Sequence, residues 1–332
     1  MTCPHCRKDH PPGPFCPFTG TSSERDPALR DVPEEVGGYF IEKVLGDGAH
    51  GVVYAARDRK TGARAALKLL HPEGAQDPVL RQRFDREIAA ACELVHPHVV
   101  RMLDIGALPD GRPWLAMELV DGESLRARLD RVKTLPLGHA IAVASAVLSA
   151  LEAAHAVGIV HRDVKPENVL LEKSGGQIVP KLADFGLARR GNSGLTRPGM
   201  MLGTPRYLSP EQAKGRSDVD HRADLWGVGV MLFEMLTGSW PFDGKDIVAI
   251  AIAIVTQPVP LPSSRAAGIP PAIEAAIMRA LEKDRDKRVG SARELRLVLR
   301  AAMSAPSEED ASYGLPREDV SLSDTIPPDP RR

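Results

Sequence analysis

The sequence has few aromatic residues and no excess of charge of one sign, and each shortage excludes a class of protein. Across 332 residues, 43 Lys and Arg stand against 44 Asp and Glu, giving a formal net charge of −1. The chain therefore has no overall positive charge that would attract nucleic acid, and we expect no nucleic-acid partner. Aromatic residues make up 4% and hydrophobic residues 43%, which predicts a sizeable core packed from small aliphatic side chains.

Cysteine is also scarce, and its placement does not suit a disulfide framework. Cys3, Cys6 and Cys16 lie near the start of the chain, and Cys92 falls in a helix-like run. This distribution is typical of a reducing compartment. The amino terminus lacks the basic end and apolar run of a signal peptide, so we expect a cytoplasmic protein.

Long apolar runs are rare, and residues 139–160 form the one run that suggests a membrane span. Glu152 and His155 interrupt this run, which opens near Pro136 and stops at Gly158. Because charged residues inside a span are costly, we interpret the run as a buried core helix and predict no membrane span.

Strand-like segments come first along the chain, and helical segments follow. Strands are predicted at residues 40–46, 51–57, 63–70, 99–108 and 112–120, and an amphipathic helix at residues 78–95. From about residue 122 to 302 the pattern is mostly helical, and Ser291 with Glu294 predicts a capping box for the last helix. This order predicts an α+β fold, with a small β-rich lobe, a larger helical lobe and a cleft between them.

A glycine-rich segment joins the first two strands, with Gly46, Gly48 and Gly51 in a G-x-G-x-x-G pattern. Alone, this pattern is also consistent with a flexible turn. A dinucleotide site would place a helix after it, whereas VVYAAR reads as a strand. The pattern therefore favours a hairpin whose backbone amides cover phosphates.

Lys68 lies in an otherwise apolar strand, where its ammonium group needs anions. Glu87 on the predicted helix can supply one anion, and the phosphates of a nucleotide can supply another. The alternative is a lysine that reaches solvent at the edge of a strand.

The segment HRDVKPENVL packs polar residues between two apolar runs, and Asp184-Phe185-Gly186 follows Asp163 by twenty-one residues. With the glycine loop and Lys68, these motifs resemble the eukaryotic-type (Hanks-type) Ser/Thr protein kinases, specifically their bacterial branch, over about residues 39–301. The resemblance implies a bilobal protein-kinase fold with ATP and Mg²⁺ (or Mn²⁺) as cofactors and Ser/Thr-containing proteins as substrates.

The resemblance also implies domain boundaries. The kinase domain would span residues 38–301, with lobes at about 38–120 and 121–301. A linker at 21–37 would precede it, and a Pro-, Ser- and acid-rich tail at 302–332 would be disordered.

Each motif residue receives a role from the resemblance. Asp163 would orient the substrate hydroxyl and accept its proton, and Lys165 would steady the γ-phosphate. Asn168 and Asp184 would ligate Mg²⁺. Lys68, aligned by Glu87, would hold the α- and β-phosphates. His161 would be a packing residue under the cleft. The implied ATP-binding positions are Leu45, Gly46, Gly48, Gly51, Val53, Ala66, Lys68, Met117 (the gatekeeper position), Glu118 and Val120 (hinge backbone), with Glu123 near the ribose.

Further motifs imply substrate type and regulation. Lys165 and Thr204 match the Ser/Thr kinase pattern, Glu211 would pair with Arg288, and Asp224 would anchor the catalytic loop. Arg162 would meet a phosphate between Asp184 and Glu211, because phosphothreonine brings about two negative charges. The predicted autophosphorylation sites are Thr196 and then Ser193, with a dimer formed during the reaction.

Two rival functions stay open. A pseudokinase acting as a nucleotide-sensing scaffold would be marked by loss of Lys68, Asp163 or Asp184, and all three are present. A small-molecule kinase of the same fold is disfavoured by the SPE, GTPRY and Asp224-Leu225-Trp226 segments, which by resemblance build a peptide-binding region.

Residues 1–20 resemble a degenerate zinc ribbon or knuckle. Cys3, Cys6 and Cys16 could bind Zn²⁺, but Thr19 stands where a fourth cysteine is expected. His5 or His10 could complete the tetrahedron; otherwise water or a partner chain would fill the fourth position. An unstructured tail that carries thiols, or a redox role, is the alternative.

Overall fold

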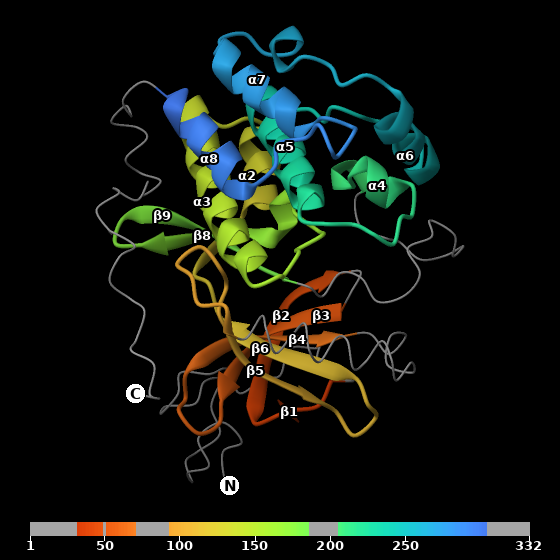
Figure 1. Ribbon diagram of the computed structural model, residues 1–332. Helices are drawn as coiled ribbons and strands as arrows, with labels where there is room; N and C mark the ends of the chain where they lie inside the picture. The colour runs from red at the N-terminus through yellow and green to blue at the C-terminus, as the bar shows by residue number, and fades with distance from the viewer. Residues whose placement is uncertain (1–31, 49–50, 71–92, 186–204, 304–332) are drawn as a thin grey trace, which may run out of the picture.

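The structure consists of a β-rich amino-terminal lobe and a larger helical carboxy-terminal lobe, as the sequence predicts (Figure 1). The computed structural model describes residues 32–48, 51–70, 93–185 and 205–303. The predicted helix at 78–95 lies almost wholly outside these ranges. The amino-terminal cysteines also lie outside them. So do the linker, apart from residues 32–37, and the tail, apart from residues 302–303.

The amino-terminal lobe contains a six-stranded antiparallel sheet in the order β1-β2-β3-β4-β6-β5. Short turns set this order: Asp58, for example, accepts hydrogen bonds from the N–H groups of Lys60 and Thr61 at 2.7 Å and so closes the turn between β3 and β4. The strands are β1 (Glu35–Val36), β2 (Tyr39–Gly48), β3 (Gly51–Asp58), β4 (Arg64–Leu70), β5 (Met102–Ala107) and β6 (Pro113–Glu118).

Strand β4 presents different chemistry to the two faces of the sheet. Leu67 and Leu69 pack with Trp114 in the core of this lobe. Because side chains alternate along a strand, Ala66 and Lys68 lie on the opposite face.

The carboxy-terminal lobe is built around two buried helices, α3 and α5, which pack against each other. Its helices are α2 (Leu125–Val132), α3 (Leu137–Ala156), α4 (Pro210–Ala213), α5 (Arg222–Thr237), α6 (Ile247–Thr256), α7 (Pro271–Ala280) and α8 (Ala292–Ala301). Ala140, Ala144 and Ala150 of α3 are fully buried, which confirms the small-aliphatic core, while Trp226 and Phe233 of α5 supply large apolar area.

Helix α3 is the run that resembled a membrane span. Among the described residues it is the one helix long and apolar enough to cross a membrane, and 72% of its apolar window is buried inside the lobe. The prediction of a buried core helix is therefore confirmed.

The sequence did not predict the small three-stranded sheet that lies next to the cleft. Its strands are β7 (Gly122–Ser124), β8 (Val169–Ser174) and β9 (Gln177–Leu182), in that order. Gly175 and Gly176, with φ of 57° and 80°, form the tight turn between β8 and β9. A Gly-Gly pair between two strand-like runs is a hairpin signal that the sequence contained.

The last helix begins as predicted, with one difference. The Ser291 hydroxyl accepts a hydrogen bond from the Glu294 N–H at 3.1 Å. The Glu294 carboxylate, however, accepts from the N–H of Gly290 and not from that of Ser291. Ser291 is therefore the N-cap, while Glu294 fixes the residue before it.

Candidate active site

The catalytic loop brings three of the predicted residues into direct contact. Lys165 Nζ lies 2.7 Å from Asp163 Oδ2. The side-chain amide of Asn168 donates to the Asp163 carbonyl oxygen at 2.8 Å and to Asp163 Oδ2 at 3.0 Å. Because both bonds use the amide nitrogen Nδ2, the side-chain oxygen Oδ1 of Asn168 is the atom that can serve as a metal ligand. The site thus combines a carboxylate, an ammonium group and an oxygen donor.

Asp224, near the start of α5, holds the backbone of this loop. Its carboxylate accepts from the N–H of His161 at 2.9 Å and from the N–H of Arg162 at 2.6 Å, and it also contacts His155 Nε2 at 2.8 Å. Arg162 has a φ of 66°, which is unfavourable for a residue with a side chain. The two bonds to a side chain that is 1% exposed hold the loop in that conformation.

His161 is fully buried and uses both ring nitrogens within the fold. Nε2 donates to the Ala183 carbonyl oxygen at 2.8 Å, and Nδ1 accepts from the Asp163 N–H at 3.2 Å. Its ring meets the Phe185 ring edge-on at 4.8 Å. These contacts match the expected packing role under the cleft.

Lys68 contacts the second predicted metal ligand. Its Nζ lies 2.6 Å from Asp184 Oδ2, with the two side chains 5% and 26% exposed. Glu87, the partner predicted from the sequence, lies outside the described residues. The contact joins the sheet of one lobe to a residue of the other, so the two predicted phosphate- and metal-binding groups meet across the cleft.

The strand register gathers the predicted adenine-binding residues on one face of the sheet. Val53 pairs with Lys68, and Ala66 pairs with Met117. Residues that pair directly lie on the same face, as do residues two apart on one strand. Next to Met117 a cavity extends between the lobes; its other lining residues are Val99, Val100, Met102, Leu115, Asp184 and Phe185.

The glycine-rich segment forms the end of the β2–β3 hairpin, where Gly48 pairs with Gly51. Gly51 has a φ of 149°, and a Cβ at this position would lie 2.2 Å from the Leu69 carbonyl oxygen. Gly46 has nothing within 4 Å of its Cβ position. The fold thus requires glycine at position 51, whereas it has room for a side chain at position 46. Leu45 on β2, a predicted ATP-binding position, is exposed.

Glu123, which the resemblance places near the ribose, is bound by two arginines. Arg131 contacts it with two nitrogens at 2.8 and 2.9 Å, and Arg128 Nε lies 2.6 Å away. The hydrogen bonds from Arg131 and Arg128 lower the pKa of Glu123 to about 2. The Glu123 carboxylate is therefore ionised at neutral pH, and Arg128 and Arg131 already use part of its hydrogen-bonding capacity.

A buried polar cluster beside the catalytic loop was not predicted from the sequence. Glu234 of α5 accepts from Arg126 at 2.7 Å and forms a short hydrogen bond with the Tyr207 hydroxyl. Burial raises the pKa of Tyr207 and of nearby Glu167, so the Tyr207 phenol stays protonated and donates. Sequence spacing carried no signal here, because Arg126 and Glu234 are 108 residues apart.

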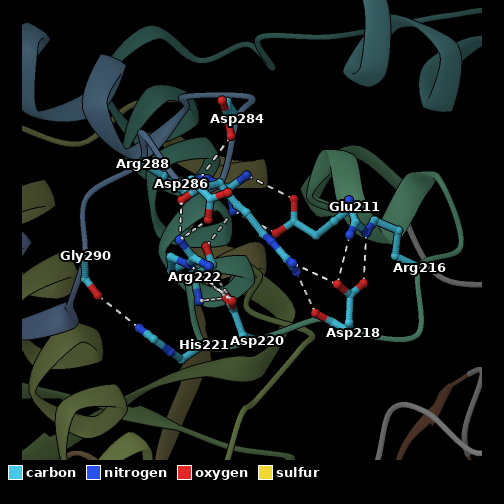
Figure 2. Close-up of polar contacts among 11 residues, drawn as sticks. Glu211, Arg216, Asp218, Asp220, His221, Arg222, Asp284, Asp286, Arg288 and Gly290 are labelled. Atoms are coloured by element: carbon cyan, nitrogen blue, oxygen red, sulfur yellow. Dashed lines mark hydrogen bonds and ion pairs between the residues drawn. The ribbon is translucent and has the colours of Figure 1, made fainter.

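The predicted pair of Glu211 and Arg288 is present at the centre of a larger ionic network (Figure 2). Two nitrogens of Arg288 contact the Glu211 carboxylate at 2.8 and 3.0 Å, and both residues are 4% exposed. Burial disfavours the Glu211 carboxylate, but the Arg288 bonds outweigh this and its pKa is lowered. Around the pair, Asp218 joins Arg216 to Arg285. The network ties α4 to the loop before α8.

The remaining predicted residues lie outside the described ranges. These are Thr196, Ser193, Thr204, and the cysteines Cys3, Cys6 and Cys16. Among the described residues, no group of three or more His, Cys, Asp or Glu could hold a metal ion.

Comparisons with known proteins agree with this architecture. The protein kinase domain family model matches residues 39–297. The kinase domain of PknI from Mycobacterium tuberculosis, a solved structure, superposes with a TM-score of 0.66 at 32% sequence identity, covering 81% of this chain and 98% of that one.

Curated relatives are serine/threonine-protein kinases of bacteria. Pkn3 of Myxococcus xanthus is 38% identical over 302 residues (89% of this chain, 54% of the relative), and PksC of Streptomyces coelicolor is 41% identical over 270 residues (78% and 48%). The chain thus spans about half the length of the curated relatives it matches. From the family match, these identities and the bilobal fold, the chain belongs to the protein kinase family, in its bacterial Hanks-type serine/threonine branch.

Proposed function

We propose that this chain transfers the γ-phosphoryl group of ATP to Ser and Thr hydroxyls of proteins. The observation that carries the proposal is the convergence of Asp163, Lys165 and Asn168 in the catalytic loop with the Lys68–Asp184 pair, which spans the cleft. Phosphoryl transfer depends mainly on alignment and on neutralising charge, and this arrangement supplies both.

In this proposal Asp163 receives the substrate hydroxyl and accepts its proton. Lys165, already 2.7 Å from that carboxylate, lies where it can also contact the transferred phosphoryl group. Lys68 turns its ammonium group to the α- and β-phosphates, beneath the hairpin in which Gly46, Gly48 and Gly51 carry no side chain. The sheet face with Val53, Ala66 and Met117 packs against adenine, and the backbone of Glu118 and Val120 binds its edge.

The donor set fits magnesium. Asn168 and Asp184 offer side-chain oxygens, the hard ligands that Mg²⁺ prefers. They come from neighbouring segments, since the Ala183 N–H donates to the backbone carbonyl oxygen of Asn168 at 2.8 Å. Bound there, the ion would neutralise charge on the phosphates. Lys68, Lys165 and the glycine hairpin fit the polyphosphate.

The test is phosphoryl transfer from labelled ATP to a generic protein substrate by wild type and Asp163→Ala. We expect Asp163→Ala to lower the rate by about 10²–10⁴-fold, because general base catalysis contributes that much, while ADP binding persists. Equal rates in the two proteins would contradict the proposal. A wild type that binds ADP but transfers no phosphate would favour the pseudokinase scaffold.

We also propose that phosphorylation at Thr196, with Ser193 as the second site, regulates the enzyme. The support is Arg162: its Nε is buried without a hydrogen-bond partner among the described residues, and its backbone is fixed by Asp224 and by Gln212. A phosphothreonine would supply strong acceptors for this guanidinium group. Phosphosite mapping after incubation with Mg-ATP tests this; an active enzyme with an unmodified Thr196 would contradict it.

Three further expectations stay predictions. They are a dimer during autophosphorylation, a cytoplasmic location, and zinc binding by Cys3, Cys6 and Cys16. For zinc, metal quantification on protein purified without a His tag is decisive, and substoichiometric metal would contradict the site.

A further inference from the structure

The link between the two lobes is short, and its ends are anchored differently. Strand β6 ends at Glu118 and β7 begins at Gly122, so only residues 119–121 pass between the two sheets. At the far end, the Asp121 carbonyl oxygen accepts from the Lys173 N–H at 2.8 Å. At the near end, the Glu118 N–H donates to the Arg101 carbonyl oxygen at 2.9 Å.

The Glu118 side chain adds a tie that crosses between lobes. Its Oε1 lies 2.7 Å from Lys181 Nζ on β9 and also accepts from the Arg101 N–H at 3.1 Å. The Glu118 and Lys181 side chains are 26% and 13% exposed, so solvent screens the pair only partly. Lys181 has a second, weaker carboxylate partner within its own sheet, Glu172 of β8, at 3.4 Å.

Strand β9 also makes backbone hydrogen bonds to the segment that leads into β5. The Leu182 N–H donates to the His98 carbonyl oxygen at 2.8 Å, and the Val100 N–H donates to the Leu182 carbonyl oxygen at 2.9 Å. His98 Nδ1 also contacts the Pro180 carbonyl oxygen at 2.9 Å. Strand β9 is therefore a fixed reference, and it leads directly to Asp184, three residues after Lys181.

We propose that the Glu118–Lys181 ion pair is a positioning element that fixes the adenine-binding hinge relative to Asp184, so that nucleotide affinity depends on it. The inference rests on the proposed nucleotide binding by the Glu118–Val120 backbone. One end of ATP would be held by that backbone and the other by groups around Asp184. An ion pair that sets the distance between these two points pre-organises the site, and its loss should weaken nucleotide binding more than it slows transfer.

The test is a double-mutant cycle on the full chain, with ADP affinity measured by calorimetry. Glu118→Gln keeps an acceptor for the Arg101 N–H but removes the charge, and Lys181→Gln removes the other partner. We expect each to weaken ADP binding by roughly 3- to 10-fold, with the double variant no weaker than either single one, because contacting residues are non-additive. The KM for ATP should rise by the same factor, while kcat changes less than 2-fold.

Two controls separate positioning from general stability. Glu172→Gln removes the other carboxylate near Lys181 without touching the contact between lobes, and we expect wild-type ADP affinity. Lys181→Arg should bind ADP more tightly than Lys181→Gln and close to wild type, because arginine keeps the positive charge that pairs with Glu118.

Each contrary outcome has a distinct meaning. Additive effects, an equal loss in Glu172→Gln, or wild-type binding by Glu118→Gln would overturn the inference alone. A wild type that fails to bind ADP would overturn the proposed function on which it rests.

Discussion

The ammonium group of Lys68 and the carboxylate of Asp184 form a direct ion pair, with 2.6 Å between Nζ and Oδ2. The two residues are 116 positions apart in the sequence and come from different lobes. Lys68 is 4% exposed, and a buried ammonium is tolerated only beside anions. The pair therefore accounts for a lysine in an apolar strand and marks a place where the two lobes meet.

Replacing Lys68 with Met should strongly slow phosphoryl transfer while the fold persists. Met has a similar length and suits the apolar strand, but it removes the charge expected to stabilise the phosphates. We expect kcat/KM to fall by about 10²–10³-fold, the usual cost of losing one electrostatic contact in an active site. Steady-state kinetics with parallel thermal unfolding would check this, and unchanged kinetics would refute the role of Lys68.

The glycines of the hairpin should separate into a structural and a functional class. Gly51→Ala forces a φ of 149° on a residue with a Cβ and places that Cβ against the Leu69 carbonyl oxygen, so we expect a loss of at least about 1–3 kcal/mol in unfolding free energy. Gly46→Ala meets open space and should change stability by less than about 0.5 kcal/mol while raising the KM for ATP. Denaturant unfolding of both variants, compared with their kinetics, is the measurement; equal stability losses would contradict the distinction.

The two kinds of ion pair in Figure 2 should differ strongly in their effect on stability. Arg288→Ala leaves the buried Glu211 carboxylate unpaired, and we expect a loss of about 3–5 kcal/mol. Arg216→Ala breaks a pair with Asp218 in which both side chains are 51% exposed, and its melting temperature should stay near that of wild type. Similar melting temperatures for the two variants would show that burial does not decide the contribution.

Stability should fall as the pH drops from about 6.5 to about 4, partly because of His96. Burial, with the nearby His98, lowers the pKa of His96 to about 4, whereas an unfolded imidazole titrates near pH 6.5. The unfolded state thus binds a proton first, which favours unfolding in this window. His96→Asn should reduce the drop in melting temperature between pH 7 and pH 5. Parallel pH profiles for wild type and variant would rule out this contribution.

Much of the catalytic machinery could be predicted from local sequence. The segment His161–Asn168 and the triplet that begins at Asp184 are continuous stretches whose composition and order identify them, and the alternating strands around Gly51 and Lys68 follow from short-range patterns. The β8–β9 hairpin was missed although Gly175 and Gly176 signalled it, because its strands were read as part of a helical region.

The sequence by itself determined a strand-rich part followed by a mostly helical part, the two-lobed architecture and the identity of the motif residues, since these depend on neighbours along the chain. Only the tertiary structure decided which charged groups meet. Lys181 pairs with Glu118, Arg126 pairs with Glu234, and Arg128 and Arg131 both pair with Glu123. The chain has 43 basic and 44 acidic residues, and side-chain type alone does not specify their partners. Partner choice depends on distance and burial after folding, because charge interactions strengthen steeply as water is excluded.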